Sequence, residues 1–250
     1  MFYSITVDYA EGAIASAQSV WRTANAPERV RITFVVESER EARRVQQRLD
    51  TITGRSPMIV VFATSITHGW TDAPESYRYL RHSSAIWTRF LYTYPRAPSP
   101  LAAMGRYVYL DADTIVQQPI EHLVHECAKT GRMLCGCIGH VDGVTLNSGV
   151  LVFDTARWPV ISGHNCLLES ENDTDMLHCL VPSAHDRGIL PPEWNVLGLG
   201  EYLNIPEHVL DSAAILHWTG ARKPWKRNGL YVDRWSRNSA TLSVNSHDFE

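Results

Sequence analysis

The sequence has no long hydrophobic run and no leader-like start. No stretch approaches the roughly 20 consecutive apolar residues that a membrane-spanning helix requires. The opening MFYSITVDYAEG lacks the basic-then-apolar order of a secretory signal. We therefore expect a cytoplasmic protein without a transmembrane segment, or a chain from which a targeting segment has been removed.

Cysteine and lysine are both scarce. The five cysteines, at 127, 135, 137, 166 and 179, form no C-x-x-C pair and no Cys/His spacing typical of zinc, so we expect reduced thiols. Only three of the 23 cationic residues are lysines, at 129, 223 and 226. Acidic residues number 27, and the resulting net charge of −4 argues against nonspecific nucleic-acid binding as the main function.

Strand-like and helix-like segments alternate along the chain. Apolar stretches typical of strands lie at 2–7, 29–36, 58–63, 106–110, 133–138, 149–153 and 213–217. Helical periodicity occurs at 10–23, 39–50, 86–94 and 119–129. This order predicts an α/β fold with a mostly parallel sheet flanked by helices. We expect one domain over residues 1–225, followed by a polar, loosely packed tail or lid over 226–250.

Two aspartates, Asp111 and Asp113, directly follow the apolar strand at 106–110. In open α/β sheets, ligands bind beyond the carboxyl ends of the strands. Two carboxylates one residue apart can share a divalent cation, and oxygen ligands suit Mg²⁺ or Mn²⁺ better than Zn²⁺. The alternative is that both residues only cap the turn before the next helix. The same D-x-D spacing recurs at 173–175, so the spacing alone carries little weight.

Two further polar segments adjoin predicted strands. In LNSGVLVFD (146–154), Asn147 offers a donor and an acceptor to a hydroxylated ligand, and Gly149 would let a ligand approach the backbone. In HWTGARKPW (217–225), His217 could bind a metal, and the cations that include Lys223 suit a diphosphate. Taken singly, each segment is also explained by an ordinary turn, a structural histidine or a surface loop.

Together these segments carry a family resemblance. YVYLDADTIV, LNSGVLVFD and HWTGARKPW resemble the three main motifs of the family 8 glycosyltransferases, a retaining group that includes glycogenin and bacterial lipopolysaccharide galactosyltransferases. VDYAEGAIASAQSVW is similar to that family's opening segment, and AIWTRFL to a helix that presents a cation to the nucleotide-sugar. The resemblance implies a Rossmann-like GT-A fold. It also implies a metal-dependent hexosyltransferase that moves a hexose from UDP-glucose or UDP-galactose to a hydroxyl acceptor.

The resemblance implies roles for particular residues of this chain. Asp111, Asp113 and His217 would hold Mn²⁺, with Mg²⁺ as the alternative. The UDP-sugar would be contacted by Asp8 and Tyr9 at the base, Ala112 at the ribose, and Lys223 and Gly220 at the diphosphate. The donor sugar or diphosphate would be contacted by Arg89, Asn147 and Asp173. The catalytic residues would be Asp173, Lys223 and Asn147.

One departure from the family and several alternatives stay open. The segment 173–178 reads DTDMLH where the family usually has D-Q-x-x-L-N, which leaves the donor sugar undecided. The acceptor could be a saccharide, a polyol, a protein or a modified nucleic-acid base, and a homodimer is compatible with the sequence. A nucleotidyltransferase is disfavoured because the first turn lacks a Gly-rich basic loop. A non-catalytic sugar-nucleotide-binding module is the alternative from another class.

Overall fold

A seven-stranded sheet forms the centre of the computed structural model, which describes residues 1–36, 39–53, 59–63, 105–139, 143–154 and 173–238. The strand order is β3-β2-β1-β4-β7-β6-β8. All neighbours are parallel except the pairs that β7 makes with β4 and β6, which are antiparallel. The strands are β1 (Phe2–Ser4), β2 (Ile32–Val36), β3 (Ile59–Ala63), β4 (Arg106–Leu110), β6 (Leu134–Ile138), β7 (Leu146–Asp154) and β8 (Arg187–Ile189). The predicted mostly parallel sheet is confirmed, and the antiparallel strand β7 makes it a mixed sheet.

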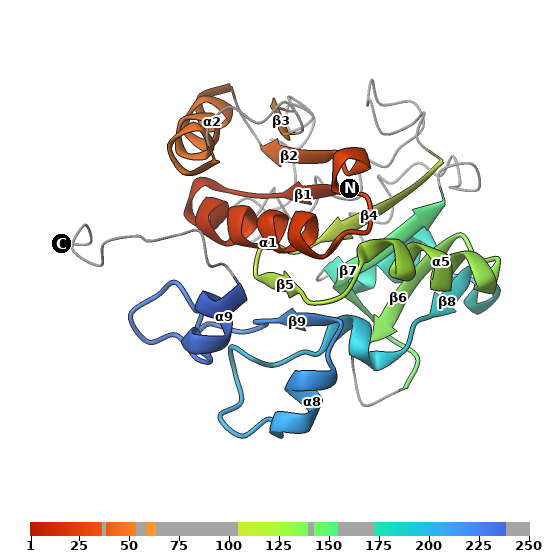
Figure 1. Cartoon of the computed structure of the whole chain (residues 1–250). Helices are drawn as coiled ribbons and strands as arrows, with labels where there is room; N and C mark the ends of the chain where they lie inside the picture. Colours follow the sequence, from red (N-terminus) through yellow and green to blue (C-terminus); the bar gives the residue numbers. More distant parts are fainter. Residues whose placement is uncertain (37–38, 54–58, 64–104, 140–142, 155–172, 239–250) are drawn as a thin grey trace, which may run out of the picture.

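Helices flank this sheet, and a second, two-stranded sheet lies beside it (Figure 1). The small sheet pairs β5 (Thr114–Val116) with β9 (Ile215–His217) in antiparallel orientation. The α-helices are α1 (Ala10–Thr23), α2 (Glu39–Thr53), α5 (Ile120–Thr130), α7 (Asp173–Leu180), α8 (Glu207–Ser212) and α9 (Val232–Asn238). The 3-10 helices are η1 (Val7–Tyr9), η2 (Pro27–Arg29), η5 (Ala184–Asp186) and η6 (Pro192–Asn195).

Strand β4 shows how the sheet is buried on both faces. Successive side chains of a strand point to opposite faces, and β4 divides accordingly. Val108 and Leu110 belong to the core cluster that contains the buried face of α1. Tyr107 and Tyr109 belong to the cluster on the other face, where α7 contributes Met176. Burial on both faces explains why the sequence of β4 is an almost continuous apolar run.

Helix α1 is built of small residues because it is buried between the large sheet and β5. Ser16 Oγ lies 3.0 Å from the hydroxyl of Tyr3 in β1 and 2.8 Å from Thr114 Oγ1 in β5. Ser19 Oγ accepts a hydrogen bond of 2.9 Å from the backbone N–H of Val116. These bonds fasten β5 to the helix. They thereby fix the position of the short segment 111–113 that joins β4 to β5.

Several predicted boundaries need correction. The helix at 10–23 and the strand at 106–110 have the predicted bounds. The strand predicted over 2–7 ends at Ser4, because the chain turns into η1. The strand predicted over 29–36 begins at Ile32, after η2, which starts at Pro27. Strand β7 begins at Leu146 rather than at Gly149. The helix predicted over 86–94 lies outside the described residues.

The chain continues to pack after residue 225. Helix α9 buries Trp235, which is 5% exposed, with its ring centroid 5.1 Å from that of Trp218 and 5.2 Å from that of Trp225. Arg234 of the same helix forms ion pairs with Glu207 and Asp211 of α8. The loose packing expected for this end of the chain therefore does not hold for α9. Residues 239–250 lie outside the described part of the chain.

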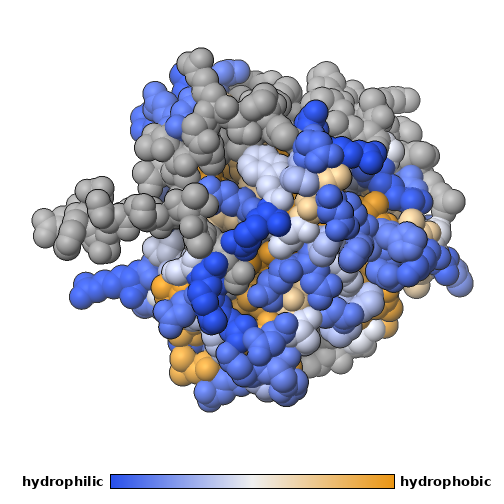
Figure 2. All heavy atoms as spheres, viewed as in Figure 1, coloured by the Kyte–Doolittle hydropathy of each residue, from blue (hydrophilic) through white to orange (hydrophobic). Residues whose placement is uncertain are grey.

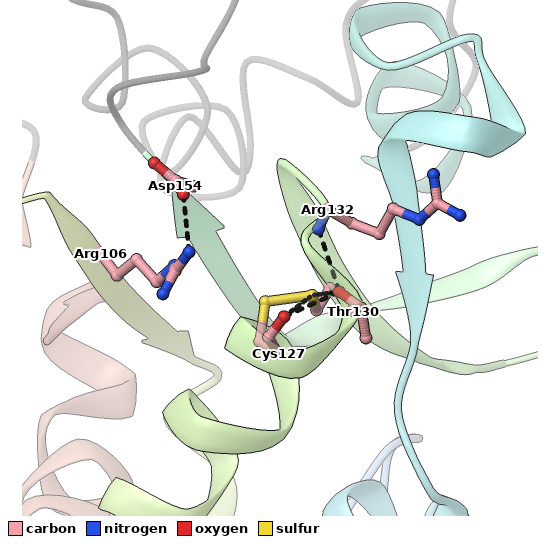
Figure 3. Close-up of a disulfide and its surroundings, with 6 residues drawn as sticks. Arg106, Cys127, Thr130, Arg132 and Asp154 are labelled. Carbon is pink, nitrogen blue, oxygen red and sulfur yellow. Dashed lines mark hydrogen bonds and ion pairs between the residues drawn. A yellow bond between two sulfur atoms is a disulfide. The ribbon is translucent and has the colours of Figure 1, made fainter.

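A disulfide joins Cys127 to Cys135, so the expectation of reduced thiols is wrong for this pair (Figure 3). Cys127 lies in the last turns of α5, and Gly131, the residue after the helix, has a left-handed conformation with a φ of 62°. The reversal after this glycine brings the chain back as β6, and the two Cα atoms come within 5.7 Å, which a disulfide can span. Cys179 is also disulfide-bonded, whereas Cys137 is a free, buried thiol.

The exposed surface is mostly polar. Figure 2 shows hydrophilic residues over most of the coloured part of one face, with apolar atoms in small groups between them. Among the described residues, the large apolar side chains classed as exposed are those of Val144, Ile189, Tyr202, Leu203 and Val232. Within the described ranges, no helix combines the length and the hydropathy needed to cross a membrane.

Candidate metal and nucleotide site

The two aspartates lie where β4 of the large sheet passes into β5 of the small one. The backbone N–H of Asp111 donates to the carbonyl of Gly149 in β7 at 2.7 Å, which extends the β4–β7 ladder by one bond. The hydroxyl of Tyr109 donates to Asp111 Oδ1 at 2.5 Å. Asp113 is only 5% exposed. Asp111 is thus fixed by contacts with the sheet and Asp113 is buried, which disfavours the interpretation that both residues only cap an exposed turn.

His217 joins the aspartates from a strand that is about 100 residues away in sequence. It ends β9 and pairs with Thr114, the residue after Asp113. Its Nε2 atom lies 3.3 Å from Asp113 Oδ1 and 3.6 Å from Asp111 Oδ2, and the residue is 2% exposed. In the described part of the chain, these three residues offer ligand atoms that all lie within 4.8 Å of one another.

The donor set and the space around it fit a divalent cation. Two carboxylate oxygens and one imidazole nitrogen are ligands that Mn²⁺ accepts readily, and Mg²⁺ favours the oxygens. Gly149 leaves room for the third ligand: a Cβ built on it would lie 2.7 Å from Asp111 Oδ2 and closer still to His217 Cε1. The sequence predicted that a bound ligand approaches Gly149. In the structure it is the imidazole of His217 that approaches it.

Lys223 lies against the same carboxylate and forms a buried ion pair. Its ammonium group contacts Asp113 Oδ2 and donates to the carbonyl of Trp218 at 2.7 Å, and the residue is 7% exposed. Burial alone would raise the pKa of Asp113, but His217 and Lys223 outweigh burial and hold this pKa below its ordinary value. The carboxylate therefore stays ionised, and the ammonium group occupies a position beside the metal-ligand cluster.

Tyr9 forms one wall of the site. Lys223 Nζ lies 5.9 Å from the centroid of its ring, and the ring of Trp225 packs edge-on at a centroid distance of 5.8 Å. Burial raises the pKa of the Tyr9 hydroxyl, an effect that Lys223 opposes and the nearby aspartates, led by Asp113, reinforce. Asp8 is exposed beside it on η1. The structure thus brings Tyr9, Lys223 and the aspartates together.

Gly12 allows helix α1 to approach the segment 111–113. A Cβ at this position would lie 2.7 Å from the carbonyl oxygen of Ala112 and about as close to the ring of Trp225. Ala112 is buried, with 5% exposure. Gly12 and Trp225 were both inside segments that the sequence analysis quoted, yet neither was predicted to shape the site. Their contacts connect parts of the chain that are 100 or more residues apart.

Asn147 adjoins this centre through Gly149 and Asn195. Asn147 Oδ1 accepts hydrogen bonds of 2.9 Å from the backbone N–H of Gly149 and from Asn195 Nδ2. Gly220 has a φ of 95°, and a Cβ there would meet the side chain of Glu201. Asp173 begins α7, and Arg89 lies outside the described residues. Asn195, which no sequence pattern marked, also belongs to the site, because it is hydrogen-bonded to His217 at 2.9 Å.

Comparisons with known proteins agree on one family. The sequence profile described as "Glycosyl transferase family 8" matches residues 1–229. A curated relative, "Probable galacturonosyltransferase 10" of Arabidopsis thaliana, is 25% identical over a match that spans 56% of this chain and 32% of that protein. The chain therefore matches about a third of the length of that relative.

Two solved structures share the fold. The galactosyltransferase LgtC, crystallised with donor and acceptor sugar analogues, has a TM-score of 0.63 at 18% identity, covering 97% of this chain and 96% of its own. The glycosyltransferase GlyE of Streptococcus pneumoniae TIGR4 has a TM-score of 0.62 at 16% identity, covering 93% of this chain and 58% of its own. The architecture is therefore that of the GT-A glycosyltransferases.

Proposed function

Since the chain belongs to glycosyl transferase family 8, we propose that it moves a hexose from a UDP-sugar to a hydroxyl group of an acceptor, with retention at the anomeric carbon. The observation that carries this proposal is the cluster of Asp111, Asp113 and His217 beside Lys223. A site with anionic metal ligands and a buried ammonium group suits a diphosphate bound through a cation. A sugar-binding module without catalysis would not need this combination.

In this proposal Asp111, Asp113 and His217 hold Mn²⁺, with Mg²⁺ as the alternative. A divalent cation bound there would act as a Lewis acid towards the diphosphate and stabilise the negative charge of the leaving UDP. The protein contributes preorganisation: Tyr109 orients Asp111 and the β5–β9 pairing places His217 next to Asp113. Because the ligands are already in place, little ordering is required when the cation arrives.

Lys223 would neutralise phosphate charge. In the structure its ammonium group contacts Asp113. When a diphosphate and a cation bind, the cation would take the place of the ammonium group at Asp113, and the ammonium group would contact the diphosphate instead. Gly220 lies in the same loop as Lys223, and backbone N–H groups near it would donate to phosphate oxygens.

The rest of the donor would be contacted by other segments. Tyr9 would stack on the base with Asp8 beside it, and Ala112 would lie near the ribose. Arg89, Asn147 and Asp173 are proposed to contact the sugar, with Asp173 and Asn147 taking part in catalysis.

The cellular compartment in which the protein works stays a prediction. The cytoplasmic location expected from the sequence conflicts with the disulfide between Cys127 and Cys135, because structural disulfides are typical of oxidising compartments. Mass measurement of the protein purified from its natural source, with free thiols alkylated in urea so that buried thiols also react, would decide between the two. A mass showing these two cysteines unmodified by alkylation would support an oxidising compartment.

Calorimetric titration tests the donor half of the proposal. UDP is titrated with and without Mn²⁺, followed by UDP-glucose, UDP-galactose and UDP-galacturonate, the last because one relative is named a probable galacturonosyltransferase. We expect UDP to bind only weakly without Mn²⁺, and the ranking of the three sugars to indicate the donor. Equal binding of UDP with and without metal would contradict the proposed metal site.

A matched pair of variants localises the metal. Asp111→Asn removes one proposed ligand charge, whereas Asp154→Asn makes the same change at the opposite end of the β4–β7 pair, where Asp154 bonds Arg106 at 3.0 Å (Figure 3). We expect only the first variant to lose metal-dependent UDP binding. Asp113→Asn is a less clean probe, because it would leave the buried ammonium group of Lys223 without its charged partner.

A further inference from the structure

A chain of three hydrogen bonds leads from the backbone of β7 to the imidazole of His217. Asn147 Oδ1 accepts from the N–H of Gly149 at 2.9 Å and from Asn195 Nδ2 at 2.9 Å. The other end of the Asn195 amide, Oδ1, lies 2.9 Å from His217 Nδ1. Asn195 is 4% exposed and His217 is 2% exposed, so water does not compete at this end of the chain of bonds.

The donor and the acceptor of each of these bonds can be assigned from the backbone N–H of Gly149, which can only donate. A backbone N–H is always a donor, so the atom of Asn147 that faces Gly149 N must be the amide oxygen. That oxygen also faces Asn195, and it requires a donor there, which makes the facing atom of Asn195 its nitrogen. The Asn195 oxygen is thereby directed at His217 Nδ1, where it can only accept. His217 Nδ1 must therefore carry a proton.

We infer that Asn195 is a positioning residue that holds a proton on Nδ1 of His217, so that Nε2 is the ring nitrogen left to face Asp111 and Asp113 and to bind a metal. The opposite tautomer would place an N–H on Nε2, where the carboxylates would accept it, and this arrangement would leave no lone pair for a metal. Histidines that bind metals commonly have their second nitrogen fixed by such a partner. The metal-binding consequence rests on the proposed function, whereas the position of the proton does not.

The backbone holds Asn195 in register with His217. Asn195 ends η6, and the next residue, Val196, donates its N–H to the carbonyl of Ile215 at 2.9 Å. The N–H of His217 in turn donates to the carbonyl of Val196 at 2.9 Å. Val196 thus runs beside β9 as a short parallel bridge to Leu216. This pairing places the side chain of Asn195 next to the imidazole independently of any ligand.

Two variants separate the positioning role from simple packing. Asn195→Asp keeps an oxygen acceptor opposite Nδ1 and loses only the donor to Asn147, whereas Asn195→Leu has a similar size and offers neither donor nor acceptor. We expect the Leu variant to bind Mn²⁺ about 10- to 100-fold more weakly, and the Asp variant to retain binding within a few-fold of the wild type. Thermal unfolding of both variants reports on folding, and equal losses of metal binding in the two would overturn the positioning role.

The ring protonation is measured directly by nitrogen NMR of histidine-labelled, metal-free protein, because protonated and unprotonated ring nitrogens have well-separated shifts. We expect a proton on Nδ1 of His217 in the wild type and in Asn195→Asp, and no proton on Nδ1 in Asn195→Leu. An unprotonated Nδ1 in the wild type would overturn the inference. If the NMR result holds but UDP and Mn²⁺ do not bind, the proposed function fails while the role of Asn195 stands.

Discussion

Gly149→Ala tests whether the position of His217 depends on a missing side chain. The φ angle of Gly149 is not positive, so alanine can adopt its backbone conformation. The effect of the substitution therefore comes from the added methyl group alone. That methyl group would lie 2.7 Å from Asp111 Oδ2 and closer still to His217 Cε1. Ordinary carbon–carbon contact is about 3.5–4.0 Å, so the imidazole would have to move by about 1 Å or more.

Moving the imidazole of His217 by this distance would cost free energy, because several contacts hold it in place. It is 2% exposed, bonded to Asn195, and carried by a strand paired on both sides, by Thr114 and by Val196. Inserting a methyl group into such packing costs about 1–3 kcal/mol of unfolding free energy. A misplacement of about 1 Å at a catalytic group can cost about 100-fold in rate. We therefore expect Gly149→Ala to remain folded, with metal binding and turnover reduced by about 10- to 100-fold.

Gly136→Ala is the matched control. Gly136 lies in the neighbouring strand β6, and a Cβ there would lie 3.0 Å from the Cδ2 methyl of Leu151, the far end of a side chain that can rotate. Calorimetric Mn²⁺ titration and urea unfolding would be run on both variants. If Gly149→Ala binds Mn²⁺ as tightly as Gly136→Ala and the wild type do, the argument that the glycine makes room for the metal-binding imidazole is refuted.

Three further predictions concern buried groups. Lys223→Met removes the ammonium group that contacts Asp113. We expect this variant to bind Mn²⁺ about tenfold more tightly in calorimetry without nucleotide, and to bind UDP more weakly in a separate titration. An unchanged Mn²⁺ affinity would show that the ammonium group and the metal ion do not compete for Asp113. Trp235→Ala should lower the unfolding free energy in urea by about 3–5 kcal/mol, and a loss below about 1 kcal/mol would mean that α9 contributes little to the fold. Burial raises the pKa of the Cys137 thiol to about 12 from an ordinary value of 9.0. The unfolded thiol ionises first, so this group's contribution to stability is present below pH 9 and is lost as pH rises from about 9 to about 12. At pH 8 the peptide containing Cys137 should be alkylated in urea and not in the native protein, and native labelling detected by mass spectrometry would contradict this.

Local sequence patterns were sufficient to predict helix α1, strand β4 and the position of the metal-ligand candidates at the end of that strand. The sequence of α1 predicted its bounds, because small and apolar residues recur at helical spacing from Ala10 to Thr23. The apolar run of β4 predicted both the strand and the position of Asp111 and Asp113 beyond it. Such signals depend on neighbours within a few residues, so they survive without knowledge of the rest of the molecule.

Contacts between distant segments were decided only by the tertiary structure. The family resemblance grouped His217 with the aspartates, but the β5–β9 pairing is what sets its distances to them. The bond from Asn195 to His217 could not be predicted, because a single asparagine before a valine has no distinctive pattern. The same holds for the burial of Trp235 against Trp218. The strands and motifs were therefore determined by the sequence itself, because hydrophobic periodicity is local, whereas the proton on His217 was decided by packing, because it depends on groups from three separate segments.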